Sequence, residues 1–192
     1  MKKVVALIRQ YWKEIMEPSN TYSGVMMPKE GNMRILIVSD THGRHDILEK
    51  VIAENGPFDK MFHLGDVENG ENEIRQMANC PVEMVRGNND YFSNLPRELE
   101  FMLGKYRIVM SHGHNYRVSV GLSEITREAQ VRGIDYMMFG HLHRPIIEKR
   151  GSVTLINPGS ISYPRQEGRR PTYIIMTIDE KEQVYLELKE VS

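Results

Sequence analysis

Five short polar motifs, each placed directly after a short apolar run, constrain this chain more than any other feature. In sequence order they are Asp40-Thr41-His42, Gly65-Asp66, Gly87-Asn88-Asn89-Asp90, Ser111-His112-Gly113 and Gly140-His141-Leu142-His143. The steps from position 42 to 66, 66 to 88, 88 to 112 and 112 to 141 each match about the length of one strand–helix unit. Because the carboxyl ends of strands in an open α/β sheet meet in one crevice, we expect the motifs to converge there.

The apolar pattern divides the chain into two regions. Up to residue 139, compact apolar runs alternate with helical patterns, which predicts strands and helices in turn. Later in the chain, strands without intervening helices are predicted at residues 153–156, 172–178 and 184–188. These three predict a second, more antiparallel sheet. Two sheets packed face to face, with helices outside, satisfy both regions, so the expected class is α/β.

Length and composition exclude several classes of protein. The chain has 192 residues, of which 40% are hydrophobic, enough for one domain with a full core. Its formal net charge of -1 argues against a dedicated nucleic-acid-binding protein. No apolar run approaches the roughly 18 residues that span a bilayer, so no membrane partner is expected. The one cysteine, Cys80, excludes an internal disulfide and makes a cytoplasmic protein the expectation.

Residues 1–32 form a predicted N-terminal extension, and residues 33–192 form the predicted main domain. An apolar stripe at helical spacing predicts an amphipathic helix before Pro18, made of Val4, Ile8, Tyr11, Trp12 and Ile15. Residues 18–32 contain Pro, Ser, Asn and Gly and are predicted as a linker. Three interpretations of the stripe stay open: it docks on the protein's own surface, it contacts a partner or forms a homo-oligomer, or it is a leader before a start at Met27 or Met33.

The motifs carry side chains that bind divalent metal ions. Asp40 and His42 lie two residues apart, so an extended segment turns both toward one ion. His141 and His143 have the same spacing, which in a strand separates them by roughly 6.5 Å. That distance suits two ions about 3.5–4 Å apart. Asp66, in the middle of the series, is a suitable carboxylate to bridge them.

The complete ligand set has two carboxylates, one amide and four imidazoles: Asp40, Asp66, Asn88, His42, His112, His141 and His143. A set without thiolates suits Mn, Fe, Zn, Co or Ni and disfavours a structural zinc cage. Two divalent ions against two carboxylates leave a surplus of about two positive charges. That surplus attracts a phosphate ester and generates a hydroxide at neutral pH.

The order of these motifs resembles that of the calcineurin-like metallophosphoesterase superfamily, over residues 33 to about 190. The residues that carry the resemblance are Asp40-x-His42, Gly65-Asp66, Gly87-Asn88, His112 and Gly140-His141-x-His143. The compact size and Asn157-Pro158-Gly159-Ser160 are similar to the small bacterial and archaeal phosphodiesterase branch, the YfcE type. The resemblance implies a four-layer αββα sandwich of two mixed sheets flanked by helices.

The resemblance also implies a role for each ligand. One ion would be held by Asp40, His42, Asp66 and His143. The other would be held by Asp66, Asn88, His112 and His141, with Asp66 as the bridge. The implied activity is metal-dependent hydrolysis of a small phosphate ester, first of all a phosphodiester, by a hydroxide that bridges the ions. Manganese is the expected metal, and the predicted catalytic residues are Asp66, Asn89 and His112.

Asn89 departs from the family pattern, in which His often follows Gly-Asn and the small branch often has Cys. An amide donates a hydrogen bond to a phosphoryl oxygen but transfers no proton at neutral pH. We therefore expect phosphodiesters and activated esters to be preferred over simple monoesters. The alternative is a non-catalytic scaffold or protein-binding module of the same fold, like the retromer subunit. That class usually has damaged ligand positions, and here every position holds the expected residue type.

Other side chains near the motifs have less specific expectations. His63 is expected in the core or supporting a ligand, and His45, at a helix start, is expected to be solvated. His114 lies two residues from His112 and is a candidate for contact with substrate or a ligand. Arg144 and Arg165 follow the motifs in predicted loops. We expect both side chains to be exposed to solvent, and the alternative is that they contact a phosphate group.

Overall fold

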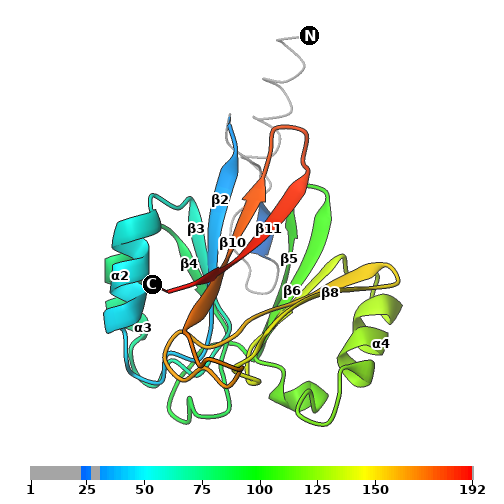
Figure 1. Ribbon diagram of the computed structural model, residues 1–192. Coiled ribbons are helices and arrows are strands. Elements are labelled where there is room, and N and C mark those ends of the chain that lie inside the picture. Colours follow the sequence, from blue (N-terminus) through cyan, green and yellow to red (C-terminus); the bar gives the residue numbers. More distant parts are fainter. Residues whose placement is uncertain (1–22, 27–30, 192) are drawn as a thin grey trace.

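The computed structural model describes residues 23–26 and 31–191, which build two sheets between layers of helix (Figure 1). The five-stranded sheet has the order β11 (Val184–Glu190), β10 (Thr172–Ile178), β2 (Met33–Val38), β3 (Lys60–His63) and β4 (Val82–Met84). The six-stranded sheet has the order β1 (Ser23–Met26), β5 (Glu98–Leu103), β6 (Tyr106–Ser111), β7 (Tyr136–Phe139), β9 (Val153–Pro158) and β8 (Pro145–Arg150). Both sheets mix parallel and antiparallel pairs.

Helices cover the outer face of each sheet. On the five-stranded sheet lie α2 (Asp46–Asn55) and α3 (Glu71–Ala78), and on the six-stranded sheet lies α4 (Ser123–Val131). Figure 1 shows α2 and α3 on one side of the molecule and α4 on the opposite side. The expected four-layer αββα sandwich is therefore confirmed.

Strand β2 shows why the sequence has unbroken apolar runs. Ile35 and Ile37 join the core between the two sheets, in the cluster that contains Phe101 of β5. Leu36 and Val38 point the other way and join the cluster that includes apolar side chains of α2 and α3. Because both faces of the strand are covered, these four consecutive side chains of β2 are buried, and alternation with polar residues is lost.

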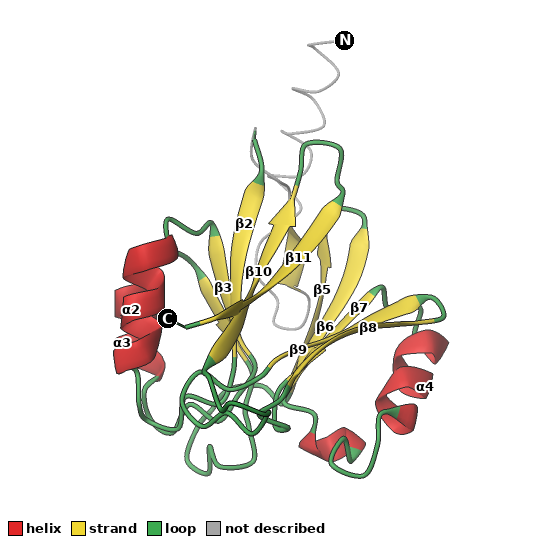
Figure 2. Ribbon diagram, in the orientation of Figure 1, coloured by secondary structure: helices red, strands yellow, loops and turns green. Residues whose placement is uncertain are grey.

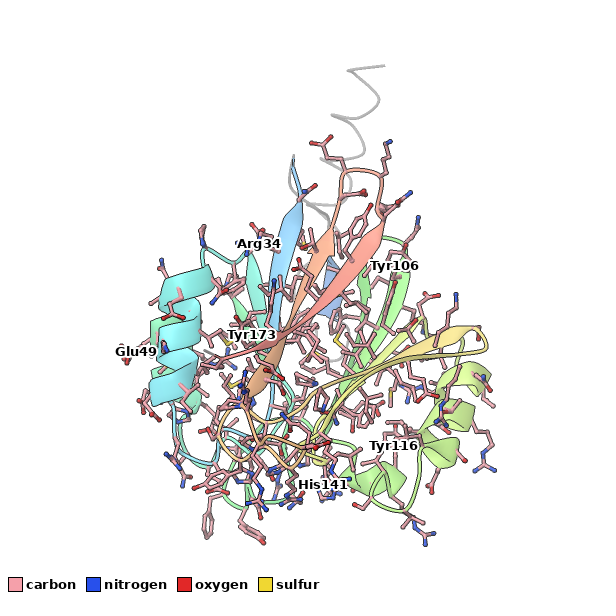
Figure 3. All side chains as sticks on the ribbon, in the orientation of Figure 1. Arg34, Glu49, Tyr106, Tyr116, His141 and Tyr173 are labelled. Atoms are coloured by element: carbon pink, nitrogen blue, oxygen red, sulfur yellow. The ribbon has the colours of Figure 1, made fainter. Side chains whose placement is uncertain are left out.

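Strand direction brings the five motifs to one end of the molecule. Strands β2, β3 and β4 are parallel neighbours, and so are β6 and β7. Each motif follows the carboxyl end of one of these five strands. Figure 2 shows the loops gathered at that end, below both sheets. Figure 3 places the labelled His141 there, at the opposite end from Arg34 and Tyr106.

The strand-rich last third does not form a sheet of its own, so that prediction was wrong. Strand β9 pairs in parallel with β7, whereas β10 pairs antiparallel with β2 in the other sheet. Neither β8 nor β1 is predicted from the sequence, and β1 lies inside the predicted linker, paired in parallel with β5. The sequence pattern identifies a strand but not its partner, because pairing joins distant segments.

The predicted N-terminal helix and its apolar stripe lie outside the described residues, and a domain boundary at residue 32 stays a prediction. In the described part of the chain, no helix has the length and apolar character needed to cross a membrane.

Candidate metal centre

Five polar residues of the motifs adopt a left-handed backbone conformation. Their φ angles are 57° for Asp40, 48° for His42, 55° for Asp66, 68° for His141 and 56° for His143. Asp and His enter this region more readily than most residues, but each such residue still costs of order 1–3 kcal/mol. Strain of this kind persists only where the surroundings fix it, and it concentrates at functional sites. The strand ends are therefore shaped to aim these side chains.

The first group of candidate ligands consists of Asp40, His42 and His143, whose ligand atoms lie within 4.8 Å of one another. The Nε2 atoms of His42 and His143 are 3.3 Å apart. Asp40 Oδ1 lies 3.2 Å from Nε2 of His143. Three side chains from two motifs a hundred residues apart thus present their ligand atoms to one small volume.

The second group consists of Asp40, Asp66 and His112, also within 4.8 Å of one another. Nε2 of His112 lies 3.4 Å from Asp66 Oδ2 and 3.9 Å from Asp40 Oδ1. The amide oxygen of Asn88 lies 3.0 Å from the same nitrogen. Asp40 is the carboxylate shared by the two groups, while the family resemblance assigns the bridging role to Asp66.

The outer nitrogens of three imidazoles are fixed by oxygen acceptors. Nδ1 of His42 lies 2.7 Å from Oε1 of Glu68, Nδ1 of His143 lies 2.6 Å from the Tyr163 carbonyl oxygen, and Nδ1 of His112 lies 2.7 Å from the Leu64 carbonyl oxygen. Because these oxygens only accept, each Nδ1 carries the proton and donates it. In the neutral ring the lone pair is then on Nε2, which faces the cluster. Metal-binding histidines have this arrangement.

The carboxylates of the cluster stay ionised. Burial alone would raise the pKa of Asp40, but the imidazoles of His143 and His112 outweigh it and lower that pKa. Burial would also raise the pKa of Asp66, but His112 and the backbone N–H of Asn89 outweigh it and lower that pKa. For His112, burial lowers the pKa, but Asp66 and Asp40 outweigh it and raise it. Buried negative charge of this kind demands a cation nearby.

These residues fit a divalent metal ion. Asp40 Oδ1 is buried and makes no aligned hydrogen bond with any described residue. Two carboxylates, an amide oxygen and inward-facing imidazole nitrogens surround it, which is the donor set of a borderline divalent cation. Burying a carboxylate oxygen without a hydrogen-bond donor is costly. Coordination of a metal ion by Asp40 Oδ1 would explain why this oxygen lacks a donor.

His141 lies beside these groups but belongs to neither. Its ring centroid is 5.2 Å from that of His112, and its backbone N–H donates to Asp40 Oδ2 over 3.2 Å. Its Nε2 lies 3.0 Å from the Ser119 hydroxyl. Six of the seven predicted ligands therefore converge closely, and the ring of His141 stands next to them with its Nε2 engaged elsewhere.

Residues 33–181 match the family model of the calcineurin-like phosphoesterase superfamily domain. The chain belongs to this superfamily. Among curated relatives, a probable metallophosphoesterase of Bacillus subtilis, YsnB, is 34% identical over 148 residues, which cover 77% of this chain and 85% of YsnB. The phosphodiesterase YfcE of Escherichia coli is 27% identical, with coverage of 69% and 82%.

Solved structures agree with this membership. A conserved protein of Streptococcus pneumoniae, described as a predicted phosphoesterase, superimposes with a TM-score of 0.68 at 28% identity, over 83% of this chain and 98% of that protein. Vps29 from Entamoeba histolytica superimposes with a TM-score of 0.64 at 18% identity, over 83% of this chain and all of that one, and shows the shared fold. The fold thus occurs in proteins with different names across bacteria and eukaryotes.

Within the superfamily domain, Asn89 contacts the candidate bridging carboxylate. Its backbone N–H donates to Asp66 Oδ1 over 2.8 Å, and its side-chain amide donates to Oδ2 over 2.7 Å. Gly87 makes this approach feasible, since a Cβ there would lie 2.0 Å from Asp66 Oδ1. The side-chain amide of Asn89 therefore lies within the candidate centre and acts as a hydrogen-bond donor there.

Asp90 organises the same loops, and sequence reasoning gave it no role. Its buried carboxylate accepts four backbone N–H groups at 2.7 to 2.9 Å, those of Asp66, Val67, Glu68 and Gly87. It thereby ties the loop after β3 to the loop after β4. Its position in the Gly87-Asn88-Asn89-Asp90 motif is the only signal in the sequence that singles it out.

Two residues at the end of β9 and just after it, Asn157 and Ser160, also support the ligands. The side-chain amide of Asn157 donates to the Gly140 carbonyl oxygen over 2.7 Å. The hydroxyl of Ser160 donates to the Asp40 carbonyl oxygen over 2.8 Å. Sequence reasoning used the Asn157–Ser160 segment only for the family resemblance, and the structure shows that it buttresses the backbone of two ligand motifs.

The remaining histidines differ in environment. His63 is fully buried, bonds to the Thr41 hydroxyl and accepts the Gly65 N–H, and burial lowers its pKa to about 3. The expectation that His45 is solvated was wrong, because its ring is only 6% exposed and packs against Gly70. The ring centroid of His114 lies 5.5 Å from that of His112. Burial and the charge of His112 lower the pKa of His114.

Proposed function

We propose that this protein is a phosphodiesterase that hydrolyses small phosphate esters with two divalent metal ions. The single observation that supports this most is the convergence of three Nε2 atoms and two carboxylates around the buried Asp40 Oδ1. Within the described residues, the ion-pair partners of Asp40 and Asp66 are imidazoles, with no lysine or arginine among them. Family membership and the name of the YfcE relative point to the same chemistry.

The proposed assignment of ligands follows the sequence prediction. One ion would be held by Asp40, His42, Asp66 and His143, and the other by Asp66, Asn88, His112 and His141. When bound, the two ions supply Lewis acidity toward the phosphoryl oxygens and lower the pKa of a water molecule. The chain itself positions the ligands: Glu68, the Tyr163 carbonyl and the Leu64 carbonyl orient the three fixed imidazoles.

Asn89 accounts for the proposed preference for diesters. Its side-chain amide donates to Asp66 Oδ2 in the centre, and an amide N–H is also a donor for a phosphoryl oxygen. It supplies no proton to a departing alkoxide at neutral pH, so leaving groups of low pKa are favoured. Diesters of aryl alcohols meet that condition. Asn89→His should raise activity on simple monoesters, and unchanged or reduced activity on monoesters would count against this role.

The test compares bis(p-nitrophenyl) phosphate with glycerol phosphate, an unactivated monoester, on the full chain with manganese. We expect turnover of the diester, faster than that of the monoester, and its loss in EDTA with recovery when manganese is restored. Faster turnover of the monoester would overturn the diester assignment. Absence of turnover with every metal tried would favour a non-catalytic scaffold, the alternative expected from the N-terminal stripe. A cytoplasmic location and homo-oligomer formation stay predictions.

A further inference from the structure

A basic cleft opens directly beside the candidate metal centre. The cavity has a volume of about 740 Å³, and His42 and His143 form the part that borders the metal centre. The other residues that line the cavity are Glu68, Arg144, Tyr163, Pro164, Arg165 and Arg169. A substrate held at the metal centre would therefore extend into a space lined by arginines.

The three arginines of this cleft are Arg144, Arg165 and Arg169. Within the described residues, none of them has a carboxylate partner, and all three are exposed. Arg144 Nε donates only to a backbone oxygen, that of Arg165 at 3.1 Å. By contrast, Arg170 on the same loop pairs with Glu190, 3.3 Å away. Guanidinium groups that converge on a cavity without counter-ions are suited to an anionic ligand.

The one acidic residue of the cleft lining does not neutralise the arginines. Glu68 Oε1 lies 2.7 Å from Nδ1 of His42, so its carboxylate is engaged by that ring. The cleft therefore carries a net positive charge next to a site that itself requires cations. A phosphate group satisfies both features, because its oxygens match the fork of a guanidinium group.

The arginine loop is fixed relative to the metal centre. The Tyr163 carbonyl accepts Nδ1–H of His143, and the Arg165 N–H donates to the His143 carbonyl oxygen over 2.9 Å. The Tyr163 ring also packs edge to face against the His42 ring, with 5.3 Å between the ring centroids. The Arg44 guanidinium lies over the Tyr163 ring, 5.5 Å from its centroid. A ligand group bound by this loop would be held in a defined position relative to the reacting phosphate.

We propose that the substrate is a small phosphodiester that carries a second phosphate, and that Arg144, Arg165 and Arg169 bind this second phosphate. The inference rests on the proposed function and names its substrate class. The second phosphate takes no part in bond breaking. It orients the diester so that its scissile phosphorus lies at the metal centre, and it selects against diesters that have one negative charge.

The test uses two chromogenic diesters that differ in one group: thymidine 5′-(p-nitrophenyl phosphate) and the same compound with a 3′-phosphate. We expect the manganese-loaded full chain to show a kcat/KM about ten-fold higher for the compound with two phosphates. In the Arg165→Gln/Arg169→Gln variant the ratio of the two kcat/KM values should fall to about one, whereas the matched control Arg170→Gln should keep it. A ratio near one in the unmodified chain, or an unchanged ratio in the double variant, overturns the proposal.

A binding measurement keeps the two proposals separate. Calorimetry in EDTA compares thymidine 3′,5′-bisphosphate with thymidine 5′-monophosphate on the full chain, so it needs no turnover. Tighter binding of the bisphosphate, lost in Arg165→Gln/Arg169→Gln and kept in Arg170→Gln, supports the arginine site even if neither diester is hydrolysed. Equal binding of the two nucleotides overturns the arginine site while leaving a diesterase intact. An equal loss in Arg170→Gln would assign the effect to general surface charge and would also overturn it.

Discussion

The candidate metal centre has two halves that differ in how their histidines are oriented. Around His42 and His143, both rings have Nδ1 fixed by an oxygen acceptor, whereas around His112 and His141 only His112 has this fixation. His42 and His143 each have Nδ1 bonded to an oxygen, and their Nε2 atoms face each other. On the other side, His112 is bonded to the Leu64 carbonyl, but His141 turns its Nε2 to Ser119. Both rings of the first half thus face the candidate metal centre, whereas Nε2 of one ring of the second half is bonded elsewhere.

This difference has an energetic consequence. A ligand already in its binding orientation loses little conformational freedom when an ion arrives. To coordinate an ion as proposed, His141 would have to give up the bond to Ser119, and its partly exposed ring would have to be ordered. We therefore expect the half around His42 and His143 to bind its ion more tightly than the other half.

The largest effect is expected from Asp40→Asn, which removes the carboxylate that lies in both close groups of candidate ligands. Turnover of an aryl diester should fall about a thousand-fold, or about 4 kcal/mol of transition-state stabilisation, and bound manganese should fall below one per chain. Plasma mass spectrometry of the dialysed protein measures the metal. The melting curve in EDTA is the control for folding: a cooperative transition shows that the variant is folded, and a lower midpoint is expected because Asp40 loses its charge interactions with His143 and His112. An active variant with two ions would show that ion binding does not depend on the Asp40 carboxylate.

The next largest effects are expected from alanine substitutions of His143 and His141, one in each half of the centre. His143→Ala should weaken the tighter manganese site about a hundred-fold, whereas His141→Ala should weaken only the looser site, about ten-fold. Manganese titration followed by electron paramagnetic resonance separates the two affinities. Equal losses, or a larger loss in His141→Ala, would contradict the difference between the halves.

A smaller effect is expected from the partner that orients His42. Glu68→Ala leaves Nδ1 of His42 without its acceptor, so manganese affinity should fall ten- to a hundred-fold at the tighter site, about the usual effect of such partners. Glu68→Gln keeps an acceptor oxygen and should lose less. Glu73→Gln, on the exposed side of α3, is the matched control for the change in charge. If Glu68→Ala bound manganese normally, the orientation argument would fail.

The smallest effect is expected at Ser119, and it has the opposite sign. Ser119→Ala removes the group that competes for Nε2 of His141, so the looser site should bind manganese a few-fold more tightly. The titration used for the histidine variants measures this. A weaker looser site in Ser119→Ala would mean that the hydroxyl supports the ion-binding position of His141 and does not oppose it.

The fold class and the convergence of the motifs could be predicted because both depend on local patterns. An apolar run followed by a polar motif identifies the carboxyl end of a buried strand, as at Asp40 and Asp66. The pairing of β10 with β2 could not be predicted, since these two strands lie far apart in sequence, although β10 also pairs with its neighbour β11. Strand β8 is an edge strand with exposed Glu148 and Lys149, so it has no apolar pattern to detect.

The parts of the centre that the sequence missed all depend on contacts between distant loops. The carboxylate of Asp90 has its role only because the loop after β3 brings Asp66, Val67 and Glu68 to it. His45 is buried because Gly70, after β3, allows its ring to pack closely. Nothing in the residues adjacent to either side chain carries that information.

The most direct test of the account is an anomalous difference map at the manganese edge, from crystals of the full chain grown with manganese. We predict two peaks about 3.5–4 Å apart, one beside His42 and His143 and the other beside His112 and His141, with Asp66 or Asp40 between them. A single peak, or peaks away from these side chains, would contradict a two-metal phosphoesterase centre.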